Sequence, residues 1–93
     1  MTTVNISENA EEQAEDMKWS LRRWPQALNC FKEDIEKHIT FLEEDMRLGR
    51  LFPKAGPTAR EIPLYRGKIL MRYDEQIEGT VQIFEFIWAS RNK

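Results

Sequence analysis

The sequence predicts an α+β domain in which an N-terminal strand and a two-helix antiparallel hairpin precede a three-stranded antiparallel sheet, in the order β-α-α-β-β-β. Between residues 8 and 47, apolar residues recur every three or four positions, as on the buried face of a helix. After residue 60 the spacing changes to the alternation typical of strands. The 93 residues are too few for a second core, so we expect a single domain over residues 1–93, with both helices on one face of the sheet.

The chain opens with a short strand and the first helix. Val4 and Ile6 alternate with polar residues, which is typical of a strand over residues 2–6. Ser7 can cap the following helix, and the glutamates just after it favour the positive end of the helix dipole. Apolar residues then recur at steps of four and three positions: Ala10, Ala14, Met17, Leu21 and Trp24. This spacing predicts a helix of about 16 residues with one buried stripe.

A second, longer helix is expected over residues 25–47. Pro25 ends the first helix and suits the first position of the next one, where an N–H group would have no partner. The apolar residues keep the helical spacing: Leu28, Phe31, Ile35, Ile39, Leu42 and Met46. Gly49 then favours the end of the helix. Because so little chain separates the two helices, they must pair as an antiparallel hairpin.

The C-terminal half reads as a loop and three strands. Residues 51–58 contain two prolines and a glycine and are predicted to be a loop. Strands are expected at residues 61–65, 68–74 and 80–88, joined by tight turns. The proline within the first of these strands places it at an edge of the sheet or at a strand start.

The last strand is apolar on both faces, which predicts a central strand covered on both sides. Strict alternation puts Val81, Ile83 and Ile87 on one face, and Phe84, Phe86 and Trp88 on the other. The helical hairpin can cover only one of these faces. We therefore expect the face that carries the aromatic residues to be an exposed patch that a partner buries. The alternative is that the loop at residues 51–58 and the last residues of the chain cover it.

Composition and charge exclude several classes of protein. No apolar run approaches the ~20 residues of a membrane span, and the N-terminus lacks the basic flank and apolar core of a secretory signal. A single cysteine cannot form an internal disulfide, which fits a reducing compartment, so we expect a cytoplasmic protein. Residues 1–50 carry seven Lys and Arg against eleven Asp and Glu, and residues 51–93 carry seven against five. The net charge of −2 argues against strong nucleic-acid binding by the protein itself.

Several short motifs, in this order, resemble the ParE/RelE superfamily of toxins from bacterial toxin–antitoxin modules. The matching segments span nearly the whole chain: residues 6–12, 27–42, 48–50, 60–62, 68–73, 79–83 and 90–91. Among them are Arg60-Glu61-Ile62, which resembles an Arg-Glu-Leu strand of the family, and Leu48-Gly49, which precedes Arg50 as in its Gly-Arg motif. The order and spacing of the motifs together carry the resemblance.

The resemblance implies a compact toxin that a cognate antitoxin neutralises by wrapping an extended or helical segment around the sheet and the helical hairpin. ParE-type members block DNA gyrase without catalysis, whereas RelE-type members cleave mRNA on the ribosome. We expect a ParE-like, non-enzymatic inhibitor with DNA gyrase as its target, acting in plasmid stabilisation or growth regulation and forming oligomers with its antitoxin. The alternatives are a RelE-like ribosome-dependent mRNA endonuclease and a degenerate, non-toxic member of the same fold.

The residues that RNA cleavage would need are incomplete. Without a metal, the reaction needs a base, an acid and cationic stabilisation of the phosphorane. The resemblance places the RelE-type lysines near Glu61 and Pro63, which cannot fill these roles. Lys68 and Arg91 match two arginines of the family, and the tyrosine near its C-terminus has no counterpart. The carboxylate of Glu61 would also repel a phosphate at that place. We therefore expect no catalytic residues, or only Lys68 and Arg91 if the protein is a nuclease.

The sequence offers no metal or cofactor site. His38 is the only histidine and lies beside Ile39 on the helical stripe, which favours a structural role. Cys30 has no histidine at a useful helical spacing, and a lone cysteine is usually buried. One Cys and one His cannot form a zinc site, and no glycine-rich phosphate loop is present. We expect neither a metal nor a cofactor.

Binding is therefore the expected activity of the C-terminal half, which interleaves cationic and aromatic residues. Arginine and aromatic side chains dominate the energies of protein interfaces. The residues expected to bind the antitoxin or the target are Arg60, Tyr65, Arg66, Lys68, Arg72, Tyr73, Phe84, Phe86, Trp88 and Arg91. The alternative is that they form an ordinary solvated face of the sheet.

Overall fold

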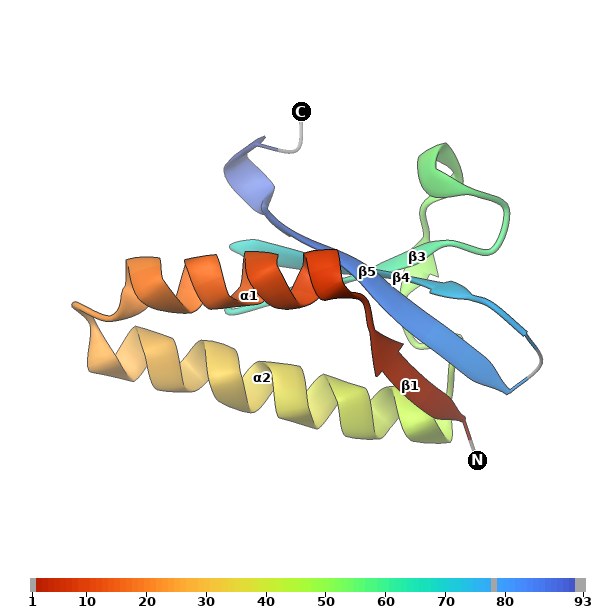
Figure 1. The fold of residues 1–93 in the computed structure, drawn as a ribbon, viewed down its shortest axis with the longest axis horizontal. Coiled ribbons are helices and arrows are strands. Elements are labelled where there is room, and N and C mark those ends of the chain that lie inside the picture. Colours follow the sequence, from red (N-terminus) through yellow and green to blue (C-terminus); the bar gives the residue numbers. More distant parts are fainter. Residues whose placement is uncertain (1, 78, 92–93) are drawn as a thin grey trace.

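Two helices pack on one face of a five-stranded sheet in the computed structural model, which describes residues 2–77 and 79–91 (Figure 1). The helices are α1 (Glu8–Leu21) and α2 (Pro25–Glu44). The strands are β1 (Thr3–Ile6), β2 (Arg50–Leu51), β3 (Arg60–Leu64), β4 (Ile69–Glu75) and β5 (Thr80–Trp88). Short 3₁₀ helices follow β2 and β5: η1 (Pro53–Ala55) and η2 (Ala89–Arg91). The α+β class and the helical hairpin on one face of the sheet are confirmed.

The strand order of the sheet is β1-β5-β4-β3-β2. All neighbouring strands are antiparallel except β1 and β5, which run parallel, so that the first and last strands of the chain lie side by side (Figure 1). The strand β5 has the predicted bounds and lies inside the sheet, between β1 and β4.

The sheet has one strand more than predicted. The short strand β2 pairs antiparallel with β3, so that Arg50 lies opposite Glu61. Leu51 therefore belongs to a strand, and the prediction of a loop over residues 51–58 is wrong at its first residue. Gly49 permits this close approach, because a Cβ atom at that position would lie only 2.7 Å from the carbonyl oxygen of Glu61.

Both helices end earlier than the apolar spacing predicts. The helix α1 ends at Leu21 rather than Trp24, because the Trp24 N–H donates to the carbonyl oxygen of Leu21 at 2.9 Å in a tight turn. The helix α2 begins at Pro25 as predicted and ends at Glu44 rather than at residue 47. The turn between the helices leaves Trp24 outside the buried stripe, with 59% of its surface exposed.

The core lies between the helical hairpin and the sheet. Ser7 caps α1 as predicted, since its Oγ accepts a hydrogen bond from the Ala10 N–H at 3.1 Å. The first four residues of the predicted stripe of α1 are buried: Ala10, Ala14, Met17 and Leu21. They pack with Phe31 and Leu42 of α2 and with the inner face of the sheet. From the sheet this core takes Ile62, Leu64, Ile69, Met71, Tyr73, Val81, Ile83 and Phe86.

A β-bulge interrupts the pairing of β4 with β5. Arg72 lies opposite Glu85, whereas the next residue of β4, Tyr73, lies opposite Ile83. Phe84 is therefore an extra residue in β5 that has no counterpart across the strand pair. An inserted residue of this kind shifts the alternation of side chains by one position.

The bulge overturns the predicted faces of the last strand. Val81 and Ile83 before the bulge and Phe86 after it are all buried in the same core. Phe86 and Trp88 thus share the helical side with Val81, and Ile87 lies on the opposite side of the sheet. Phe86 is only 2% exposed, so the prediction that it lies on an uncovered face is wrong. Period-two alternation could not show the bulge.

The structure also bears on the membrane question. Among the described residues, no helix combines the length and the apolar character needed to cross a bilayer.

Candidate functional site

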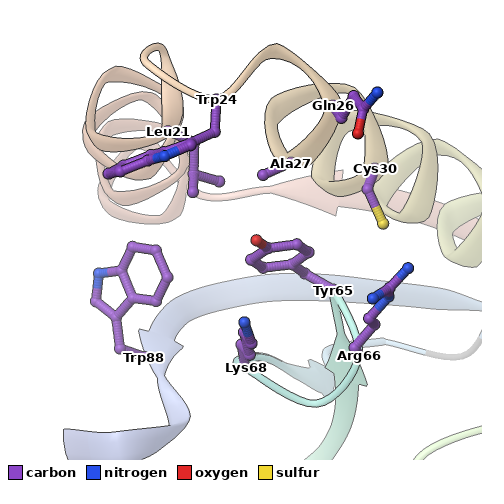
Figure 2. A pocket seen from close by; sticks show the side chains of 9 residues that line it. All are labelled: Leu21, Trp24, Gln26, Ala27, Cys30, Tyr65, Arg66, Lys68 and Trp88. Carbon is purple, nitrogen blue, oxygen red and sulfur yellow. The ribbon is translucent and has the colours of Figure 1, made fainter.

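A groove opens between the turn that joins the two helices and the turn that joins β3 and β4 (Figure 2). Its volume is about 560 Å³. The helical side is lined by Leu21, Trp24, Gln26, Ala27 and Cys30, and the sheet side by Tyr65, Arg66, Lys68 and Trp88. The groove therefore brings together four of the ten residues that the sequence predicts to bind a partner.

The sheet side of the groove is built on a left-handed turn. Tyr65 and Arg66 have φ angles of 47° and 57°, and Gly67 follows with 81°. Left-handed backbone costs a residue with a side chain roughly 1–2 kcal/mol, so Tyr65 and Arg66 are strained. The Tyr65 N–H donates a hydrogen bond to the Asp34 carboxylate on α2 at 2.8 Å. This bond ties the strained turn to the helical hairpin across the groove.

The aromatic residues of the groove differ in how far they are exposed. Trp88 is half-buried and packs against the core, and Tyr65 is half-buried on the turn. Trp24 projects from the helical turn and is largely exposed, and Figure 2 shows its ring at the same end of the groove as Trp88, on the opposite wall. Nearby in sequence, Trp19 is 66% exposed and stacks under the Arg22 guanidinium at 3.7 Å. Exposed tryptophans in such numbers are typical of surfaces that bind another molecule.

The groove is cationic. Arg66 and Lys68 both point into it, on either side of Tyr65 (Figure 2). The Lys68 ammonium lies 5.3 Å from the centre of the Tyr65 ring. None of the described residues that line the groove carries a carboxylate, and neither cation forms an ion pair within the described part of the chain. The groove thus offers positive charge beside apolar rings.

Arg72 lies on the other face of the sheet, in a ladder of charged side chains. Its guanidinium bonds to the Glu61 carboxylate at 3.2 Å and to the Glu85 carboxylate at 2.6 Å. Arg50 also bonds to Glu61, at 2.7 Å, and the ring of Phe52 lies 4.0 Å from the Arg72 guanidinium. Arg72 is 5% exposed and Glu61 is 4% exposed. The structure therefore gives Arg72 an internal role instead of the predicted place at a binding surface.

The same ladder corrects the sequence argument about Glu61. The sequence predicts that the carboxylate repels a phosphate, but it pairs with two arginines and is only 4% exposed. Removing one partner of a buried ion pair leaves an uncompensated charge. The ladder therefore stabilises its strands only when all of its charged residues are present.

Arg60 and Tyr73 hold the segment that follows α2. The Arg60 guanidinium donates to the carbonyl oxygen of Gly49 at 2.6 Å. The Tyr73 hydroxyl donates to the carbonyl oxygen of Met46 at 3.0 Å and accepts from the Gly49 N–H at 2.8 Å. Burial raises the pKa of this phenol, and Tyr73 is only 1% exposed. Tyr73 is therefore part of the core rather than of a binding surface.

Two of the remaining predicted residues, Phe84 and Phe86, do not line the groove. Phe84 is half-buried at the bulge of β5, and Phe86 is in the core with its ring edge-on to Phe31 at 6.2 Å. The side chain of Arg91 is outside the described residues. His38 bonds through Nδ1 to the carbonyl oxygen of Asp34 at 2.8 Å, within its own helix.

The described side chains do not assemble acid–base or metal chemistry around the one described nuclease candidate. Lys68 lies in the groove under the helical turn, where its described neighbours are apolar, amide, thiol, phenol or cationic groups. Among the described residues, no three His, Cys, Asp or Glu side chains are grouped so that they could hold a metal ion.

Sequence reasoning missed the helical half of the groove. The apolar spacing places Trp24 in the buried stripe of α1, and it predicts no surface role for Ala27 or Cys30. The signal was present in the Trp-Pro pair at residues 24–25, because a proline that starts a new helix turns the preceding residue out of the previous one.

Comparisons with known proteins identify the fold. No family model and no curated protein matches the chain. A solved structure titled "Chromosomal ParDE TA system from P. aeruginosa" contains a chain that superimposes with a TM-score of 0.73. The two chains are 16% identical, and the match covers 95% of this chain and 96% of that chain. The ParE/RelE-like fold predicted from the sequence is therefore confirmed: the chain has the fold of a component of a ParDE toxin–antitoxin system.

Proposed function

We propose that the protein is the toxin of a type II toxin–antitoxin pair, a cytoplasmic ParE-like inhibitor that a cognate antitoxin neutralises. The observation that carries the proposal is the groove of cationic and aromatic residues, on a fold shared with a chain of a ParDE structure. The antitoxin occupies this groove and extends over the neighbouring helical hairpin and sheet. The target is DNA gyrase, as the resemblance to ParE-type members implies.

The geometry favours binding over catalysis as the activity of this surface. A general acid or base must lie within hydrogen-bond reach of the proton that it moves. Among the described residues that line the groove, the groups that could give up a proton are the two cations, Cys30 and Tyr65. The imidazole of His38 bonds instead to a backbone carbonyl on α2. Exposed tryptophans and unpaired arginines are instead the residues that dominate protein interfaces.

The proposal is tested by inducing the protein in bacterial cells. We expect growth arrest with filamentation and a DNA-damage response, intact transcripts, and inhibition of gyrase supercoiling by the purified protein. Co-expression of the protein encoded by the adjacent reading frame should restore growth, and the two proteins should purify as a complex. Cleaved transcripts with halted translation would instead identify an mRNA endonuclease, and normal growth would identify a degenerate, non-toxic member of the fold.

A further inference from the structure

We infer that the groove recognises a segment in which a carboxylate lies next to an apolar side chain, and that the left-handed turn at Tyr65–Arg66 is the element that receives the carboxylate. This inference deepens the proposed function, on which it rests for the source of the segment, the antitoxin. It concerns the chemistry of the partner and the residues that select it.

The charge of the groove points to an acidic partner. Arg66 and Lys68 lie on the sheet side, on either side of Tyr65, and the described lining offers them no carboxylate (Figure 2). The other arginines of known position in the C-terminal half, Arg60 and Arg72, both bond to oxygen atoms of the chain itself. The groove therefore holds two cations that form no ion pair within the described residues, and a carboxylate forms a two-point pair with a guanidinium.

The strain of the turn points to the same place. Tyr65 and Arg66 adopt left-handed backbone although neither is glycine, and Asp34 on α2 holds the Tyr65 N–H at 2.8 Å. Strained backbone of this kind persists only where the surrounding structure holds it, and it gathers at binding sites. Here the left-handed turn directs the Tyr65 ring and the Arg66 guanidinium into the groove (Figure 2).

The opposite end of the groove is apolar. The rings of Trp24 and Trp88 line it with the side chain of Leu21, from the helical turn and from β5 (Figure 2). Figure 2 places Arg66 at the other end, below Cys30, with Tyr65 and Lys68 between the two ends. An aliphatic or aromatic side chain that enters between the tryptophans would therefore bring a neighbouring carboxylate within reach of the cations.

The experiment selects peptides that bind the purified full-length protein. A random-sequence peptide library displayed on phage is panned against the immobilised protein, and the affinities of the enriched peptides are measured by calorimetry. Arg66→Glu is compared with Lys54→Glu, which makes the same charge change at an exposed position of η1 that does not line the groove. Circular dichroism and thermal unfolding establish that both variants are folded.

We expect enriched peptides to carry Asp or Glu beside a large apolar residue and to bind more weakly as salt is added. Arg66→Glu should weaken their binding by about tenfold or more, and Lys54→Glu by about twofold or less. Arg66→Lys, which keeps the charge, should retain part of the affinity. Enriched peptides without carboxylates, an Arg66→Glu affinity equal to that of the wild type, or no enrichment at all would overturn the inference.

The peptide experiment distinguishes a failure of this inference from a failure of the proposed function. Peptide selection does not depend on toxicity, so selection of acidic peptides by a protein that does not arrest growth would contradict the toxin proposal alone. Growth arrest that the neighbouring protein relieves, together with selected peptides that lack carboxylates, would contradict this inference alone.

Discussion

Cationic residues lie on both sides of the sheet, and their surroundings differ. Arg72 is buried on the outer face between two carboxylates, where it holds the strands together. Arg66 and Lys68 are exposed on the helical side, in a groove without a described carboxylate. The sequence predicts one cationic and aromatic platform, but the structure separates Arg72 from Arg66 and Lys68. Arg72 therefore serves the fold, whereas Arg66 and Lys68 form no ion pair within the described part of the chain.

The largest expected effect concerns the β-bulge, which decides which aromatic residues are buried. Phe86→Ala should lower the free energy of unfolding by about 3–5 kcal/mol, because it opens a cavity in the core beside Phe31. Phe84→Ala, at the half-buried bulge, should cost about 1 kcal/mol. Urea unfolding of the two variants checks this difference. Equal losses, or a larger loss for Phe84→Ala, would contradict the bulge and restore the alternation that the sequence predicts.

The charged ladder of the outer face is the next test. Glu61→Gln should cost about 3 kcal/mol of unfolding free energy, since it leaves Arg72 with one carboxylate fewer in a buried site. Glu75→Gln is the matched control, because Glu75 is exposed at the end of β4 and should change stability by less than about 0.5 kcal/mol. Chemical denaturation at neutral pH measures both values. A Glu61→Gln protein as stable as the control would show that the ladder does not hold the sheet.

The ionisation of Tyr73 should make the free energy of unfolding depend on pH. Its hydroxyl bonds to Met46 and Gly49, so Tyr73→Phe should cost about 1–2 kcal/mol at neutral pH by leaving buried groups unpaired. Because burial raises the pKa of the phenol in the folded state, the folded chain holds this proton more tightly than the unfolded chain. The stabilisation is complete below the ordinary pKa of tyrosine and is lost as the pH rises through the higher folded value.

The pH profile of stability checks this assignment. Wild-type stability should fall at pH values above the ordinary tyrosine pKa, and this fall should be smaller in Tyr73→Phe. An identical alkaline slope in the two proteins would mean that Tyr73 ionises in the folded state as it does in water.

The smallest expected effect concerns the strained turn of the groove. Arg66→Gly should raise the free energy of unfolding by about 0.5 kcal/mol, because glycine adopts a φ of 57° without the steric cost. Arg22→Gly is the matched control, since Arg22 has an ordinary φ of −59° and stacks on Trp19. That control should be less stable than the wild type. Thermal unfolding of both variants measures the effect, and a loss of stability in Arg66→Gly would show that the turn is unstrained.

The sequence predicts the local elements of this fold well, because each depends on residues close to one another in the chain. The bounds of β5, the Ser7 cap and the buried stripe of α1 follow from spacing and capping chemistry alone. The bulge at Phe84 does not, because it depends on the pairing of β5 with β4, and an inserted residue leaves no mark in the apolar pattern.

The site is predicted only in part for the same reason. Of the predicted binding residues, the structure brings four into one groove: Tyr65, Arg66, Lys68 and Trp88. The wall that faces them comes from the helical turn, about 40 residues away in sequence, and no local rule brings these two turns together. The burial of Arg72 follows likewise from strand pairing, which sets it opposite Glu61 and Glu85.

The central claim is that a partner protein binds the groove through its exposed rings and cations. Calorimetric titration with the protein encoded by the adjacent reading frame tests it most directly. Trp88→Ala should weaken that complex by about 2 kcal/mol, roughly thirtyfold, while Leu51→Ala, an exposed apolar residue of β2 outside the groove, should leave the affinity unchanged. A folded Trp88→Ala variant that binds as tightly as the wild type would contradict the claim.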